Sequence, residues 1–347
     1  MSLPDPPPSG KSRHAVVVIP FVLVGLFVIA WSAAWFWARG EAARRMDAYR
    51  DAWNRAGYHL AWKDREIGGF PFRIDVTITE VSVREPSGWA LEAPRIEGEA
   101  YMHAPTLWLV AAPAGITFVR PVGGPVAVKG ELIRASLSHL QNHPPNFSFE
   151  GTKLVFTPAP GAQPFALTAA DRAEFHLRQG PDDEGGVFLS LEGGKARPGT
   201  LLGRLAGERP VSMQWNSTLS KVSAFRGATW PDAVRNWARA GGTMTVRNAG
   251  ISAGGPLVGV RSGTLAVGPD GRASGVLNVT TAQAPRAFDA LAAENLIGAD
   301  AAQTASAVAR ARLADGEAIE AEINFQAGRT TFGPVSLGPA PKVYDPR

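Results

Sequence analysis

The sequence predicts an α+β protein, mainly antiparallel β, with a single N-terminal transmembrane helix, an elongated β-rich body and a late helical hairpin. Residues 15–37 carry no charge, and many short stretches after them alternate apolar with polar residues. Glycine and proline, 38 and 28 of the 347 residues, separate those stretches as turn residues do. This length is enough for one large or two modest domains with a buried core.

Composition excludes several classes of function. The chain has no cysteine, which rules out disulfides, thiolate zinc sites, iron–sulfur clusters and a cysteine nucleophile. With six histidines, we expect no metal site and no cofactor. Residues 1–65 hold nine basic and five acidic side chains, so the whole net charge of +4 lies there and the rest is balanced. A nucleic-acid partner would need a basic stripe on the folded part, and we expect none.

The N-terminal region predicts a membrane anchor. Residues 1–14 are rich in proline and predict a disordered cytoplasmic tail. A helix over 15–37 would span about 34 Å, enough for a hydrocarbon core of about 30 Å. Trp31, Trp35 and Trp37 lie at one end, as in an aromatic belt. Ser32 and Ala34 leave open the alternative of a cleaved signal peptide.

The orientation of the anchor does not follow from local charge. Two Lys/Arg residues precede the apolar segment and five follow it by Arg55, which favours a cytoplasmic C-terminus. Long domains are translocated largely regardless of charge, so both orientations stay open at this point.

Residues 38–57 predict a juxtamembrane helix that continues the anchor and ends at Gly57. Its apolar residues recur in alternating steps of four and three, which predicts a stripe packed on the following domain; a membrane-surface or dimerising stripe is the alternative. The stripe consists of Ala42, Met46, Tyr49, Trp53 and Ala56.

Residues 58–340 predict the β-rich body, divided into two halves, if at all, near 225–242. Ile74, Val76 and Ile78 alternate with polar residues, and a slip near Glu80 predicts a β-bulge or a strand that crosses between sheets. Residues 269–271 predict a hairpin turn, and 319–326 predict a strand with one wet and one buried face. Further strands are expected around 107–110, 116–119, 126–128, 154–156, 175–177, 187–191 and 213–219.

Three helices are expected within the body. Residues 231–240 begin with proline in the first turn and are followed by Gly241, a left-handed stop. Residues 285–296 and 301–313, joined through Gly298, predict a helical hairpin inserted between late strands.

The catalytic motifs in this chain lack the context that their chemistry needs, and we expect no catalytic residue and no enzyme. Ser252 lies in a G-x-S-x-G match, but the turn is not followed by a helix signal and no histidine comes after His176. His139 and His143 have helical ligand spacing, yet two prolines follow at once. A P-loop-like stretch at 9–12 lacks its first glycine, and the acidic run at 182–184 predicts a hairpin tip.

The most distinctive motif is Gly68, Gly69, Phe70, Pro71, Phe72 and Arg73. Paired glycines permit a positive φ, and Pro71 extends the chain into the strand from Ile74. We expect Phe70 and Phe72 to be buried in one cluster that anchors this strand, with Arg73 at a solvated edge. A recognition edge for a lipid or a partner is the alternative.

These motifs resemble a bacterial family catalogued as domain of unknown function 2125, found mainly in alphaproteobacteria. The resemblance covers roughly residues 40–340 and rests on Gly57-Tyr58, Trp62, 68–73, 89–94, Gly241-Gly242 and 332–339. It implies a single-pass protein of the bacterial inner membrane with its body in the periplasm, and it brings no catalytic residues. The architecture is also similar in outline to AsmA-like envelope proteins, an analogy of fold alone.

The function expected is therefore non-enzymatic: an envelope structural or lipid-handling role, with a concave sheet that offers apolar surface to acyl chains or a partner. The expected partners are the membrane and a lipid or envelope protein. An interaction scaffold without a ligand is the alternative, and a hydrolase of envelope material is the least favoured class. An apolar trough would favour lipid, and a closed sandwich would favour the scaffold. The oligomeric state stays open.

Overall fold

The computed structural model describes residues 13–344 except 143, 282, 294, 314–318 and 334. The helices are α1 (Arg13–Arg55), α2 (Leu201–Ala206), α3 (Trp230–Arg239), α4 (Ala284–Ala293) and α5 (Ala299–Leu313), with a 3₁₀ turn η1 at Val222–Ala224. The strands are β1 (His59–Ala61), β2 (Asp64–Gly68), β3 (Arg73–Arg84), β4 (Ala90–Tyr101), β5 (Ala104–Ala111), β6 (Ile116–Arg120), β7 (Gly124–Lys129), β8 (Leu132–Ser138), β9 (Asn146–Pro158), β10 (Leu167–Gln179), β11 (Glu184–Ala196), β12 (Val211–Ser220), β13 (Met244–Ala253), β14 (Pro256–Val267), β15 (Ala273–Thr281), β16 (Ile319–Gln326), β17 (Arg329–Phe332) and β18 (Val335–Pro339).

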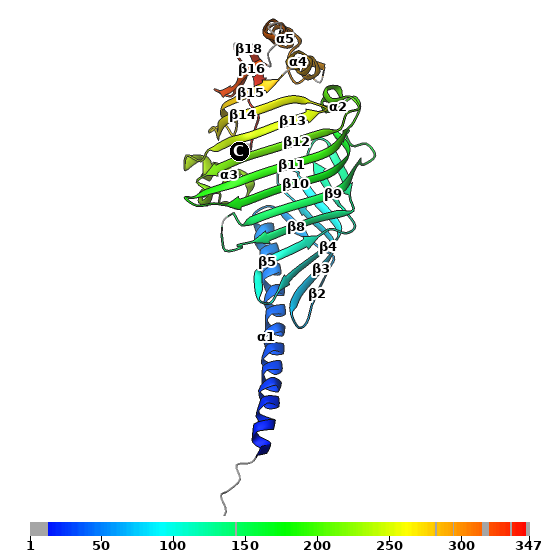
Figure 1. Ribbon diagram of the computed structural model, residues 1–347, viewed down its shortest axis with the longest axis vertical. Coiled ribbons are helices and arrows are strands. Elements are labelled where there is room, and N and C mark those ends of the chain that lie inside the picture. Colours follow the sequence, from blue (N-terminus) through cyan, green and yellow to red (C-terminus); the bar gives the residue numbers. More distant parts are fainter. Residues whose placement is uncertain are drawn as a thin grey trace, which may run out of the picture.

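The predicted fold class is confirmed: one long apolar helix precedes an antiparallel β body that carries a late helical hairpin (Figure 1). Helix α1 has 43 residues and is about 65 Å long. Its lower part projects beyond the sheet, and its upper part lies against it (Figure 1). By length and composition, Val18–Arg55 is the one described helix suited to crossing a membrane. The predicted anchor and juxtamembrane helix are one continuous helix, which ends at Arg55, shortly before Gly57 with a φ of +90°.

The described strands form one sheet in which every pairing is antiparallel. Strands β9 to β18 pair each with the next along the chain and form a long antiparallel meander. Before them, six strands close into a hydrogen-bonded ring in the order β4, β5, β8, β9, β7, β6 and back to β4. Buried residues from this ring, among them Val128, Ile133 and Leu154, form the core cluster of the first half.

The apolar pattern of β3 does change face near Glu80, as the sequence predicts, but neither β3 nor β4 has an extra residue there. Glu80 has a φ of +48°, and β3 keeps one register with β4 on either side, Thr79 opposite Arg95 and Val81 opposite Ala93. On the other edge of β3 the partner changes there from β2 to β1. A left-handed residue therefore shifts the apolar pattern at the point where the neighbouring strand changes.

The sheet is not interrupted at the connection 225–242, because the strands on either side of it, β12 and β13, pair directly with each other. Helix α3 lies in the connection. The Thr229 hydroxyl caps its N-terminus by accepting a hydrogen bond from the Asp232 amide, and Gly241 beyond its end has the expected positive φ of +76°.

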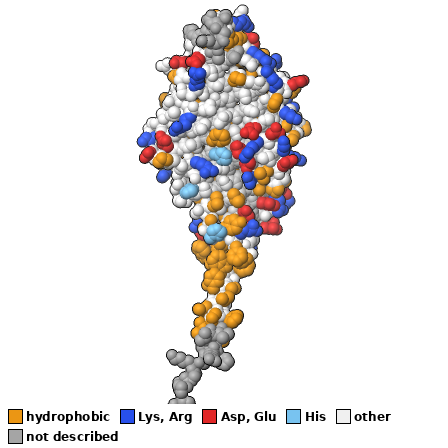
Figure 2. Space-filling view, in the orientation of Figure 1, with side chains coloured by type: hydrophobic (Ala, Val, Ile, Leu, Met, Phe, Trp, Pro, Cys, Tyr) orange, Lys and Arg blue, Asp and Glu red, His pale blue; other side chains and the backbone are white. Residues whose placement is uncertain are grey.

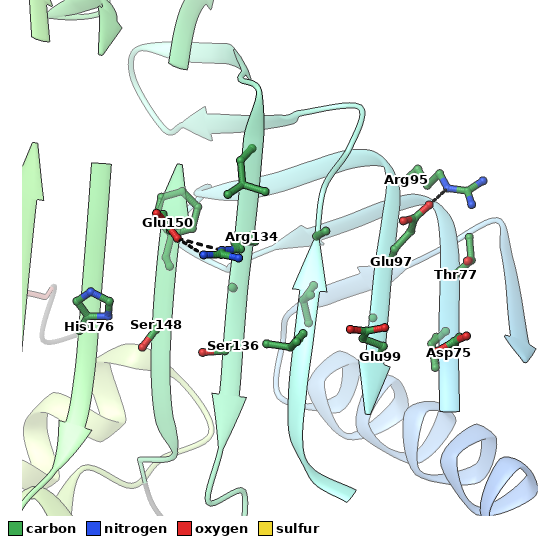
Figure 3. Close-up of a pocket in the computed structure, with 18 of the residues that line it drawn as sticks. Asp75, Thr77, Arg95, Glu97, Glu99, Arg134, Ser136, Ser148, Glu150 and His176 are labelled. Atoms are coloured by element: carbon green, nitrogen blue, oxygen red, sulfur yellow. Dashed lines mark hydrogen bonds and ion pairs between the residues drawn. The ribbon is translucent and has the colours of Figure 1, made fainter. Parts of the chain in front are cut away.

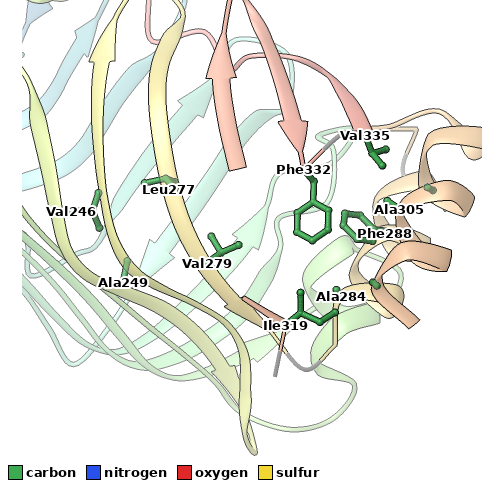
Figure 4. Packing of buried hydrophobic residues seen from close by; sticks show 12 residues of the cluster. Val246, Ala249, Leu277, Val279, Ala284, Phe288, Ala305, Ile319, Phe332 and Val335 are labelled. Carbon is green, nitrogen blue, oxygen red and sulfur yellow. The ribbon is translucent and has the colours of Figure 1, made fainter. Parts of the chain in front are cut away.

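The predicted helical hairpin is α4 and α5, inserted between β15 and β16. It covers the apolar face of the last strands, where Phe288 meets Phe332 edge-on at 5.0 Å between ring centroids. Figure 4 shows Val246, Leu277 and Val279 on that same face of the sheet. The alternation predicted for 319–326 is confirmed, since Ile319 is buried while Glu320 and Glu322 on the other face are exposed.

Candidate functional site

The family motif forms the turn between β2 and β3, which begins where β2 ends at Gly68 and closes at Arg73. The Arg73 amide donates a hydrogen bond to the Gly69 carbonyl at 2.9 Å. Gly69 has a φ of +94°, and a Cβ there would lie 2.7 Å from the Arg73 carbonyl oxygen. This position therefore requires glycine, whereas a Cβ at Gly68 would meet no atom within 4 Å.

The expectation that Phe70 and Phe72 are buried in the body is wrong. Phe70 is 54% exposed and Phe72 is 66% exposed. The physical reason is that the turn lies beyond the edge of the sheet core and packs against α1 instead. Phe70 contacts Trp35 and Phe36 with ring centroids 5.3 and 6.2 Å apart, and Phe72 contacts Trp31 at 6.4 Å. We call these five residues the aromatic collar.

Two tryptophans of the collar fasten α1 to the turn. The indole Nε1–H of Trp31 donates to the Pro71 carbonyl at 2.7 Å, and that of Trp35 donates to the Arg73 carbonyl at 2.6 Å. Trp35 is 4% exposed and packs with Ile74 and Val76 of β3. These bonds satisfy two backbone carbonyls of the turn while the tryptophan rings fill the space between helix and strand.

Charged groups begin directly above the collar. Arg39 donates through Nε to the Ile67 carbonyl at 3.0 Å, and Arg73 pairs with Glu99 at 3.0 Å. About two helical turns further along α1, Asp47 accepts two hydrogen bonds from Arg65, at 2.9 and 3.1 Å. Arg73 is exposed, as expected for a solvated edge.

The neighbouring turn between β4 and β5 lies beside the motif, because the Met102 amide donates to the Phe72 carbonyl at 2.9 Å. Tyr101, Leu107 and Leu109 of these strands are exposed. Figure 2 shows hydrophobic side chains gathered around the narrow end of the body where it meets α1. These three side chains of β4 and β5 lie on the face of the sheet opposite to α1, because they alternate along their strands with Ala100 and Trp108, and Trp108 packs with Trp35.

The strand registers align a second feature, which we call the apolar row. It consists of directly paired residues on one face of β2 to β5 and β8 to β16, and every member is apolar. The row runs Ile67, Val76, Gly98, Val110, Ala135, Phe149, Phe175, Leu189, Trp215, Ala249, Val260, Val279 and Ala321.

The next row of paired residues, one position along each strand and on the opposite face, holds no large apolar side chain. We call it the polar row, and it runs Glu66, Thr77, Glu97, Ala111, Arg134, Glu150, Glu174, Ser190, Gln214, Gly250, Gly259, Thr280 and Glu320. Along these two rows, the sheet therefore separates an apolar face from a polar one over β2 to β5 and β8 to β16.

The apolar face is only partly covered. Phe175, Leu189 and Trp215, the large members of the row on β10 to β12, are half-buried rather than buried. Further along, a cavity of about 200 Å³ between the sheet and α4 is lined almost wholly by apolar residues, including Val258, Val279 and Phe288. Large apolar side chains thus keep accessible surface between the closed ring and the helical hairpin.

The polar face carries a shallow groove of about 690 Å³ across β3, β4, β5, β8, β9 and β10 (Figure 3). Glu150 accepts from Arg134 at 2.6 Å and from Arg172 at 2.8 Å, and Arg172 also reaches Glu174 at 2.7 Å. The Arg134 hydrogen bond, helped by Arg172, holds the pKa of Glu150 below its usual 4.5. The lining of the groove holds four carboxylates and three arginines, so these ion pairs leave it close to neutral with one acidic group in excess.

The motifs with catalytic spacing are not assembled into sites. Ser252 lies within β13 and is followed by a turn into β14 rather than by a helix. Asp183 sits at the β10–β11 turn and accepts from the amide and hydroxyl of Ser223, so this acidic run is a hairpin tip. His139 lies in a turn with a φ of +54°, while His143 and 9–12 lie outside the described residues. Among the described residues, no three His, Asp or Glu side chains could hold a metal ion.

Sequence reasoning found the motif but missed its partner. Trp31 and Trp35 are four residues apart, so they lie on the same face of a helix. This spacing could have indicated that both tryptophans pack on one surface of the body. The apolar row had no comparable signal, because it depends on pairings between strands that are far apart in the sequence.

Comparison with curated proteins and with solved structures finds no match to this chain. The family model described as "Uncharacterized protein conserved in bacteria (DUF2125)" matches residues 35–341, a range that begins at Trp35 of the collar and includes the turn, the whole sheet and all the later helices. The chain therefore belongs to the family of domain of unknown function 2125.

Proposed function

We propose that this protein is a non-enzymatic, lipid-handling protein of the bacterial cell envelope, held in the inner membrane by α1 with its body in the periplasm. The occupants of its apolar face are the acyl chains of phospholipids. The observation that carries this proposal is the apolar row, and above all its large, half-buried members Phe175, Leu189 and Trp215.

The energetic argument rests on accessible apolar surface. Burial of apolar surface is worth roughly 25 cal/mol per Å², so large side chains left half-buried on an apolar face favour an apolar occupant. An acyl chain supplies that surface without needing hydrogen bonds, and the row offers none. The polar row on the other face has no large apolar side chain to bury, so it remains in contact with water.

The location of the protein is supported by α1. Its apolar segment is exposed along Val18 to Ile29, which is unfavourable in water and favourable in a bilayer. The periplasmic side is tested by a reporter enzyme active only in the periplasm, fused after Arg347. We expect activity, and an inactive fusion whose body is also protected from protease in spheroplasts would place the body in the cytoplasm.

The lipid role is tested by mass spectrometry of lipids that co-purify with the detergent-extracted protein. We compare Phe175→Asp with Phe188→Asp, which lies on the neighbouring strand and stacks on His176 on the polar face. Both residues are half-buried phenylalanines, so each variant introduces the same charge at similar exposure. We expect Phe175→Asp to reduce retained phospholipid severalfold and Phe188→Asp to leave it unchanged. Equal phospholipid retention in both variants, or no phospholipid on the wild type, would favour a scaffold without a ligand. The filled core of the closed ring is the feature of this structure that fits such a scaffold.

A further inference from the structure

The aromatic collar lies at the depth of the last two turns of the apolar segment of α1. The segment has no charge from residue 15 to Trp37, and Arg39 is the first charged residue after it. Twenty residues from Val18 to Trp37 span about 30 Å, the thickness of a hydrocarbon core. If that core ends at Trp37, then Trp31 lies about 9 Å below its boundary and Phe36 about 2 Å below it.

Phe70 and Phe72 are fixed to those same helix positions. Phe70 lies against Phe36, and Phe72 lies against Trp31, with the turn fastened by the two indole hydrogen bonds. Their depth is therefore set by α1 at about 2–9 Å below the boundary. Apolar faces of interfacial segments are buried to a similar depth of about 5–10 Å in the headgroup and acyl boundary.

The exposure of the two rings agrees with this depth. Both are more than half exposed although they belong to a turn packed on a helix. The charged groups Arg39, Arg73 and Glu99 all lie on the body side of the collar. On α1 and β3, apolar side chains thus give way to charged ones just above the collar.

We propose that the Gly68–Arg73 turn is a membrane-inserting wedge, whose exposed Phe70 and Phe72 enter the interfacial region of the bilayer that α1 crosses. The inference rests on the proposed anchoring by α1. Its occupant is the headgroup and acyl boundary of phospholipids. The wedge and α1 together hold the body at a fixed angle, with the β2 and β3 end of the apolar row next to the membrane.

The absence of cysteine makes the wedge directly testable with single-cysteine variants carrying a nitroxide spin label. The full chain is reconstituted in vesicles of phosphatidylethanolamine and phosphatidylglycerol with Phe72→Cys, Val122→Cys or Val28→Cys. Phe72 and Val122 are both exposed, at 66% and 84%, and Val28 at 53% lies within the apolar segment of α1. Val122 is the matched control because it lies in the β6–β7 turn, at the other end of β4 from the motif. Val119, three residues before it, pairs with Ala90, and Ala90 lies about 36 Å along β4 from Tyr101.

The readout is collision of the label with oxygen, which enters the bilayer, relative to a water-soluble nickel chelate. We expect the oxygen-to-nickel ratio at Phe72 to exceed that at Val122 at least threefold and to approach that at Val28. A ratio at Phe72 equal to that at Val122, with Val28 in lipid, would overturn the wedge and leave the anchor intact. A water-like ratio at Val28 would overturn the anchoring itself. Phe70→Cys provides an independent second position on the same turn.

Discussion

Docking of α1 on the body depends on Trp35, and its replacement by alanine gives a sharp prediction. Trp35 is 4% exposed, packs on Ile74 and Val76, and donates to the Arg73 carbonyl. Truncation of a buried aromatic side chain costs about 3–5 kcal/mol. Trp37 lies on the same helix two residues later and is 66% exposed, so Trp37→Ala is a matched control that should cost no more than about 0.5 kcal/mol.

The assay uses a cysteine placed under the helix. Val76 is 5% exposed beneath α1, so the thiol of Val76→Cys reacts with a water-soluble reagent only when the helix opens. Because about 1.4 kcal/mol corresponds to a tenfold change in an equilibrium, Trp35→Ala should raise the labelling rate by about two to almost four orders of magnitude. Trp37→Ala should change it less than threefold. Equal labelling rates in the two variants would refute the docking described for Trp35.

Two further predictions concern the far end and the polar face. Phe332→Ala should lower the free energy of unfolding by about 3–5 kcal/mol, because Phe332 is 4% exposed and packs against Phe288. Leu296 is exposed, so Leu296→Ala should change the free energy of unfolding by about 0.5 kcal/mol. Chemical denaturation measures both changes, and equal changes would contradict the packing of Phe332 on Phe288. The pKa of Glu150 is lowered in the folded state, so its contribution to stability is full above pH 4.5 and is lost as the pH falls through that lowered pKa. Denaturation at several pH values should therefore show the wild type gaining on Glu150→Gln as the pH rises from 3 to 7, and a difference independent of pH would contradict the assignment.

The elements of this fold follow well from local patterns. Alternation over 319–326, the proline and glycine at the ends of α3, and the 269–271 turn each report a preference that the chain satisfies within a few residues. Glu80 is an intermediate case, since the slip was visible in the sequence but its nature depended on the strands beside it.

Other features depend on contacts between distant parts of the chain. Period-two alternation assigns Phe72 and Arg73 to faces of the sheet. It does not say that the turn packs on a helix 40 residues earlier, as the hydrogen bond from Trp31 to the Pro71 carbonyl shows. The apolar row likewise requires the register of twelve strand pairs, among them the β5–β8 pairing, which skips β6 and β7. Each strand predicts its own alternation, and only the pairings align these into one face.

The central claim, that the apolar face of the sheet holds acyl chains, is tested most directly by photo-crosslinking in living cells. Benzoylphenylalanine replaces Phe175 on the apolar face or Phe188 on the polar face, a change that keeps an aromatic ring at either position. We predict light-dependent phospholipid adducts, identified by mass spectrometry, at position 175 and none at position 188. No adduct at 175, or equal adducts at both positions, would contradict the claim.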